Sequence, residues 1–183
     1  MKTFCSTTMI IVFLLLCTNV IQAQTTDAKL DQIIQLPQLS LEQKLDRSVR
    51  NTTGRDIAGI AYVKSFGKTP EDFGKYIGEH TAFFWADIKG KGSVPFVQYW
   101  YRFLQTDRNS KMEILSVSEK SVKAKMTVYG ETNLKSYSDL GVTIEEYASF
   151  YGKYSETLAD YLGLEYKQKF EDGWIVFSVT EKK

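Results

Sequence analysis

One change in the spacing of apolar residues, at Lys111, constrains the fold of this chain more than any other feature. Upstream of Lys111, apolar residues recur at intervals of three or four, which is typical of amphipathic helices. Downstream, residues 112–117 and 122–128 alternate as half-buried strands do, and Ser118–Ser121 form the turn between them. The chain is therefore predicted to place helices first and to begin a sheet only in its second half.

Three helices are predicted before this change, over residues 40–66, 69–90 and 94–107. The first starts with the capping box Ser40–Gln43. Its middle, Asn51–Gly54, has poor helix propensity, so a bend or break is expected there. The second helix has Thr69 as its N-cap and Pro70 at its first position, the usual signature of a helix start.

The second half of the chain is predicted to continue with a helix and another hairpin. Residues 130–141 form a polar connection, and a capping box at Thr143–Glu146 begins a helix that ends before Gly163. Strands follow at residues 164–170 and 174–179, and the last is apolar on both faces, which favours the middle of a sheet. The fold class is thus α+β: three N-terminal helices, a β-hairpin, a helix and a second β-hairpin, forming a four-stranded antiparallel sheet packed by helices.

The N-terminal residues have the pattern of a secretory signal peptide. A short apolar core at Met9–Cys17 precedes a small-residue cleavage site that ends at Ala23. Leu16 stands before Cys17 where a lipoprotein signal has a small residue, which disfavours lipid anchoring. We therefore expect export to the periplasm or the exterior, with a signal peptide at 1–23, a tether at 24–39, a single α+β domain at 40–183 and no membrane span after cleavage.

Composition excludes several classes of function. Removal of residues 1–23 takes Lys2 and both cysteines, Cys5 and Cys17, so 22 basic and 22 acidic residues remain without any thiol. A thiol nucleophile and a thiolate metal site are therefore excluded. The charges alternate without a basic stripe, so no nucleic-acid partner is expected.

The segment Thr69–Gly90 is the element around which we expect the fold to be organised. Its aromatic residues share one broad helix face with His80, the only histidine of the chain. Small residues form an adjoining strip at intervals of four: Gly74, Gly78 and Ala82. Such a strip lets another helix come close, and the alanines of residues 57–63 are the expected partner.

Candidate ligand contacts come from aromatic residues that gather on three predicted helices. Rings of this kind serve either as a bulky core or as the lining of a pocket that also satisfies Tyr hydroxyls. His80 would orient a ligand, or bond a neighbouring carbonyl as a core histidine. Arg102 would hold an anionic head group or stay solvated. The predicted ligand-binding residues are Tyr76, His80, Phe84, Trp100, Arg102 and Tyr151.

No catalytic residue, metal site or cofactor is predicted. A Ser-His-Asp triad would have to use His80, and the sequence contains no glycine-flanked nucleophile elbow. One histidine without cysteine disfavours zinc. The carboxylate pairs Glu71/Asp72 and Glu145/Glu146 lie in first turns of helices, where the helix dipole explains them.

The C-terminal segment Tyr147–Val179, with the run YLGLEYKQKFEDGWIVFSV, resembles the end of three types of α+β protein. These are the vinyl-reductase-type domain, the haem-nitric-oxide-binding domain and the aminothiazoline-carboxylate hydrolase-like proteins. The resemblance implies a small-molecule pocket between helices and sheet. Trp174 or Phe177 stands where members carry a cysteine in the last hairpin, so thiol chemistry and metal binding do not carry over. His80 is comparable with a haem-ligating histidine, although no motif surrounds it.

Three functions remain open at this level. The first is an exported, non-enzymatic protein that binds a small apolar or anionic molecule in an aromatic pocket between helices and sheet. The second is a hydrolase or lyase that uses His80 with a carboxylate or Tyr partner. The third is an envelope structural or protein-interaction module with an aromatic binding surface. The sequence names neither the ligand nor the oligomeric state.

Overall fold

The computed structural model describes residues 38–182, and the fold is that of the compact unit that begins at Leu41. The predicted signal peptide, residues 1–23, and the predicted tether up to residue 37 lie outside the described residues. None of the described helices is both long enough and apolar enough to cross a membrane.

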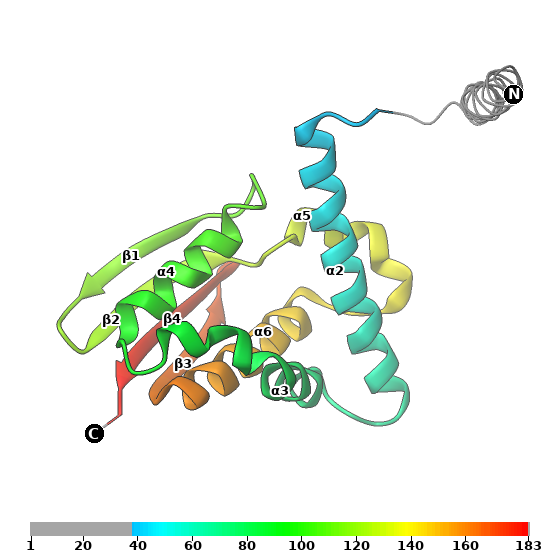
Figure 1. Cartoon of the computed structure of the whole chain (residues 1–183). Coiled ribbons are helices and arrows are strands. Elements are labelled where there is room, and N and C mark those ends of the chain that lie inside the picture. Colours follow the sequence, from blue (N-terminus) through cyan, green and yellow to red (C-terminus); the bar gives the residue numbers. More distant parts are fainter. Residues whose placement is uncertain (1–37, 183) are drawn as a thin grey trace, which may run out of the picture. The chain divides into compact units, whose positions relative to one another are not determined.

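The unit is an α+β domain, as predicted, with an antiparallel four-stranded sheet packed by helices (Figure 1). The elements follow the predicted order, with short helical pieces added between them. Along the chain they are α2 (Leu41–Ser65), α3 (Pro70–Thr81), the 3₁₀ helix η1 (Ala82–Ile88), α4 (Ser93–Leu104), β1 (Met112–Val117), β2 (Ser121–Thr127), α5 (Glu131–Leu134), the 3₁₀ helix η2 (Lys135–Leu140), α6 (Ile144–Leu162), β3 (Leu164–Glu171) and β4 (Trp174–Glu181).

The strand order is β1-β2-β4-β3, so the two hairpins lie side by side and β4 is in the middle, as its apolar faces predicted. Asp172 and Gly173 connect β3 to β4 with φ of 50° and 77°, the left-handed geometry of a tight hairpin turn. The first hairpin was predicted to have one buried face, and this is confirmed for β2 but not for β1. Ile114 and Val117 of the edge strand β1 are exposed, and a bulge shifts the register between Ile114 and Ser116.

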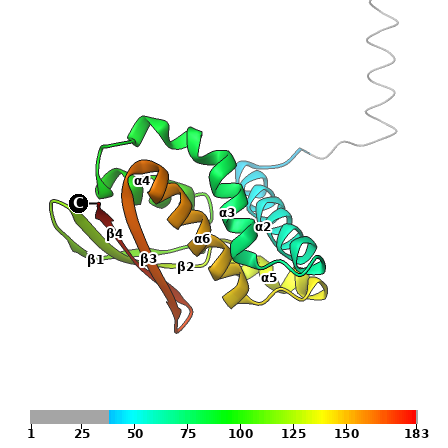
Figure 2. The ribbon, with the colours of Figure 1, turned by 90° about the horizontal axis from the view of Figure 1, so that it is seen from below.

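Helix α6, and not the segment Thr69–Gly90, is the element around which the fold is organised. It lies between β3 and α3 (Figure 2), and nine of its nineteen residues are buried, on most sides of the helix. The predicted capping box joins Thr143 to Glu146 at its start, and Gly163 ends it with φ of 80°. A helix that packs on a sheet and on another helix needs a wide apolar face.

The predicted break in the first helix is wrong, because α2 runs without interruption through Asn51–Gly54. Its buried residues, Val49, Thr53, Ile57 and Ile60, form one continuous stripe. Burial of that stripe outweighs the poor helix propensity of the residues between. The expected polar connection at residues 130–141 is also corrected, since it forms α5 and η2.

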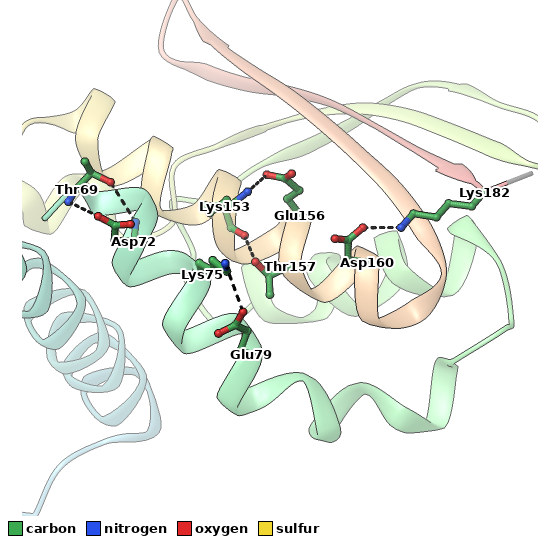
Figure 3. Close-up of polar contacts among 9 residues, drawn as sticks. All are labelled: Thr69, Asp72, Lys75, Glu79, Lys153, Glu156, Thr157, Asp160 and Lys182. Carbon is green, nitrogen blue, oxygen red and sulfur yellow. Dashed lines mark hydrogen bonds and ion pairs between the residues drawn. The ribbon is translucent and has the colours of Figure 1, made fainter.

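The small-residue strip of α3 packs on α6, and not on α2 as expected. Gly74 lies against the backbone of Phe150 and Tyr154, and Gly78 lies against Thr157. Because this contact admits only small residues, most of the aromatic face predicted to be central is turned outward. Tyr76, Phe83 and Phe84 are exposed, whereas Phe73 stacks on Phe150 at 5.3 Å. The predicted N-cap at Thr69 is present, and the structure adds a capping box with Asp72 (Figure 3), but the helix changes to 3₁₀ geometry after Thr81.

Candidate functional site

The six residues predicted from the sequence divide into a buried pair and an exposed group. Trp100 of α4 and Tyr151 of α6 are 2% and 4% exposed, and their ring centroids are 5.9 Å apart in an edge-on contact. Arg102 also lies on α4 but is exposed. Trp100 and Tyr151 are therefore the predicted residues that the fold brings together in its core.

The other three exposed residues, Tyr76, His80 and Phe84, lie on α3 and η1. The rings of Tyr76 and His80 are 4.2 Å apart, and His80 Nδ1 lies 2.8 Å from the carbonyl oxygen of Tyr76. Phe84 contacts the neighbouring ring of Phe83 at 4.0 Å. No hydrogen bond or ion pair joins His80 to a carboxylate within residues 38–182. The hypothesis of a His80 enzyme and that of an aromatic interaction surface both stay predictions.

A polar cluster that the sequence did not indicate adjoins Trp100 and Tyr151. Its centre is Asp56, a half-buried residue of α2. The Tyr151 hydroxyl donates to Asp56 Oδ2 at 3.2 Å, and the Tyr147 hydroxyl donates to the same oxygen at 3.5 Å. The two hydroxyl oxygens are 3.3 Å apart. One carboxylate oxygen thus accepts hydrogen bonds from two phenol groups that lie one helical turn apart on α6.

One buried polar atom beside this cluster, Nε1 of Trp100, has no hydrogen-bond partner among the described residues. The hydroxyl of Thr53, one turn before Asp56 on α2, interacts with the Tyr147 hydroxyl. Thr53 is fully buried, and the chain passes so close that a Cβ on Gly130 would lie 2.0 Å from its hydroxyl. Buried polar groups normally have a partner, so the unpartnered indole N–H of Trp100 indicates a place for a water molecule or a ligand.

Aromatic rings enclose the cluster on the side of α4. Trp100 meets Phe103, Tyr151 and Tyr154 edge-on, with centroid separations of 5.6, 5.9 and 5.8 Å. Phe103 in turn lies 4.2 Å from Tyr129, whose hydroxyl is 3.1 Å from Thr106 Oγ1. The Asp56 carboxylate and the two Tyr hydroxyls therefore lie beside a layer of aromatic rings. This arrangement suits a molecule with one polar end and an apolar body.

Burial sets the protonation of this cluster. It raises the pKa of Asp56 from 3.8 to about 6, while the Tyr151 hydroxyl, the charge of Arg55 and the Tyr147 hydroxyl act in the opposite direction. Burial also raises the pKa of Tyr147 and of Tyr151, so both phenols stay protonated and remain donors. Asp56 is consequently the group in the cluster that exchanges a proton near neutral pH.

Two hollows lie elsewhere on the domain, and neither is lined by any of the six predicted residues. A groove of about 660 Å³ runs between α6 and β3, and another of about 670 Å³ lies between α2 and η2. Within residues 38–182, no group of three or more His, Cys, Asp or Glu side chains is placed to hold a metal ion.

Sequence reasoning missed Asp56 because the expected break at Asn51–Gly54 divided the stripe to which it belongs. In the continuous helix α2, Thr53 lies three residues before Asp56 and Ile60 four residues after it, and both are buried. A carboxylate on an otherwise buried stripe was the signal that could have found it. Tyr147 belongs to the helix that was predicted to begin at Thr143, but nothing in the sequence indicated the partner of its hydroxyl.

Comparison with known proteins gives a weak likeness. No family model matches the chain. No curated protein matches it either. Among solved structures it is similar to an Fe(II) unliganded H-NOX protein from K. algicida, at 8% sequence identity and a TM-score of 0.29. The match covers 79% of this chain, and the chain spans 65% of that protein. This is a fold-level resemblance to one of the three predicted types, and the other two stay predictions.

Proposed function

We propose that this chain is an exported domain that binds a small molecule, without catalysing a reaction, at the cluster of Asp56, Tyr147 and Tyr151. The observation that supports the proposal is the convergence of two phenol hydroxyls on one half-buried carboxylate oxygen, next to the unpartnered buried indole N–H of Trp100. Export is inferred from the N-terminal pattern of the sequence.

The chemistry of the cluster favours a ligand with a hydrogen-bonding or cationic head and an apolar body. Asp56 provides an acceptor, and above its pKa of about 6 it also provides a negative charge. The rings of Trp100 and Tyr151 provide an apolar wall that also attracts a cation. An anionic head, the charge first expected, would be accommodated only at a pH low enough to protonate Asp56.

Three aromatic probes of similar size that differ in the charge of the head group test the proposal: benzylamine, benzyl alcohol and benzoate. The indole N–H signal of Trp100, followed by NMR at pH 7.5, should move saturably with benzylamine and little with benzoate. At pH 5 benzoate should bind more tightly than at pH 7.5, because Asp56 is then largely protonated. Asp56→Asn should remove the difference between the two pH values, whereas Tyr101→Phe, at an exposed tyrosine of α4, should change nothing.

Native mass spectrometry of protein purified from its own host provides the second readout. A retained small molecule that Asp56→Asn or Tyr151→Phe releases, in variants that still fold, is the expected result. The absence of any bound mass, together with no saturable movement of the Trp100 signal by any of the three probes, would contradict the proposal. Loss of binding in His80→Gln but not in Asp56→Asn would assign the binding site to the exposed face of α3.

A further inference from the structure

The groove between α6 and β3 follows the edge of the sheet. Its lining includes every residue from Glu165 to Phe170. Successive side chains of a strand point to opposite faces, so a hollow on one face would be lined by alternate residues. Lining by consecutive residues places this groove at the open side of the backbone, where amide N–H and carbonyl groups are presented.

That side of β3 is free of strand pairing among the described residues. The sheet order β1-β2-β4-β3 makes β3 terminal, and all its eight residues pair with β4 alone. At about 3.4 Å per residue, the open edge extends over roughly 27 Å. Figure 2 shows β3 beside α6 over much of this length.

The opposite wall is a single stripe of α6, formed by Ser149, Gly152, Lys153, Glu156 and Asp160. The floor between helix and strand is fixed by Gln168, whose Nε2 donates to the carbonyl oxygen of Ala148 at 2.9 Å and whose Oε1 accepts from the Tyr166 hydroxyl at 2.8 Å. A Cβ on Gly152 would lie 2.3 Å from Gln168 Nε2, so glycine lets the floor form. A rigid floor beside an unpaired strand edge is a ready surface for an added strand.

The charges of the groove leave one lining carboxylate without a cation. Lys153 pairs with Glu156 at 2.9 Å and Lys182 pairs with Asp160 at 2.6 Å (Figure 3). On the strand itself, Lys167 pairs with Glu165, and Lys169 pairs with Glu171. Glu71, at the start of α3, forms no ion pair with any residue of the described part of the chain.

We propose that this groove binds an extended peptide, which adds to the sheet as a fifth strand along β3 and places a basic side chain next to Glu71. Only an extended backbone matches the alternating donors and acceptors of a strand edge over such a length. The other edge is less suited to an added strand, since the bulge of β1 disturbs its ladder.

The test uses three blocked hexapeptides and amide hydrogen exchange measured by NMR on the isotope-labelled protein. The first is acetyl-Thr-Val-Lys-Val-Thr-Val-amide, the second has Glu in place of Lys, and the third, acetyl-Pro-Pro-Lys-Pro-Pro-Pro-amide, keeps the charge but lacks almost all donors. The first should protect alternate amides of β3, and the third should protect none. The Lys peptide should bind about two- to five-fold more tightly than the Glu peptide, the range for one exposed charge pair.

Matched variants locate the site. Ser149→Trp should fill the groove and abolish protection, whereas Ser136→Trp, at an exposed serine of η2, should preserve it. Glu71→Gln should remove the preference for the Lys peptide, and Glu79→Gln, two turns along the same helix and outside the groove, should leave it. Asp56→Asn should not alter peptide binding, which separates this groove from the proposed small-molecule site.

Four results would overturn the proposal or a part of it. Equal protection by the proline peptide would show that no strand is added. Protection confined to β1 would assign the docking edge to the other side of the sheet. Protection of β3 that rises with protein concentration in the absence of peptide would mean that the occupant is a second copy of this chain. Equal binding of the Lys and Glu peptides would remove the role of Glu71.

Discussion

The close packing of α3 on α6 leads to a quantitative prediction for Gly74→Ala. A Cβ at this position would lie 2.4 Å from the backbone carbonyl oxygen of Phe150 and 3.1 Å from the backbone nitrogen of Tyr154. Neither atom can be moved by a change of rotamer, because both belong to the backbone of α6. Relief requires α3 to move away from α6 along the whole contact.

Two opposing effects set the magnitude. Alanine gains about 1 kcal/mol over glycine as a helix former. Overpacking of a close contact costs about 1–3 kcal/mol, and the upper end applies where backbone has to move. The variant should therefore lose about 2 kcal/mol of unfolding free energy. With a urea dependence of about 2 kcal/mol per molar, that loss lowers the unfolding midpoint by about 1 M.

Urea unfolding followed by circular dichroism measures this shift, with two reference variants. Gly59→Ala should lose less, because its Cβ would meet the outer end of the Phe73 ring, which can turn aside. Lys75→Ala, next to Gly74 but facing solvent in an exposed pair with Glu79, should change stability by less than about 0.5 kcal/mol. If Gly74→Ala were neutral or stabilising, the helices would not be in backbone contact, and the reasoning would be refuted.

Two further predictions concern titration and capping. Because the pKa of Asp56 rises to about 6 on folding, the stability from its bound proton is complete below pH 3.8 and is lost as pH rises through 6. Asp56→Asn should thus stabilise by on the order of 2 kcal/mol at pH 8 and little near pH 3.5, as urea unfolding at both values would measure; an equal gain at both contradicts it. Thr143→Ala should cost about 1 kcal/mol in thermal unfolding, because the hydroxyl accepts the Glu146 N–H at 3.2 Å, and Thr143→Ser should restore most of it.

Local signals in the sequence predicted the elements well where each depends on neighbours along the chain. The sequence predicted the N-cap at Thr69, the capping box at Thr143 and the terminating Gly163. Each depends on contacts within one turn, and all three are present. The place of β4 inside the sheet followed from its apolar faces alone. These features do not depend on which elements meet in space, and therefore they can be predicted from the local sequence.

The candidate site depends on contacts between distant segments, and the sequence predicted only part of it. Tyr151 and Trp100 were expected in an aromatic pocket, and they do meet in the core. Asp56 lies 95 residues before Tyr151, and no local pattern links the two. The expected bend at Asn51–Gly54 hid Asp56 further, since propensity was given more weight than the continuous buried stripe on either side.

The outward turn of the α3 aromatic face follows from a competition between two faces of one helix. Rings bury more area, but each ring holds the neighbouring helix farther away. Glycine at positions 74 and 78 allows backbone contact with α6, which fixes the side of α3 that faces inward and leaves Tyr76 and His80 in solvent. Glycines four residues apart should therefore count for more than aromatic content when the buried face of a helix is predicted. The exposed rings are then a consequence of how closely α3 packs on α6. The better candidates for ligand contact are the rings of Tyr147 and Tyr151, which α6 holds in the core.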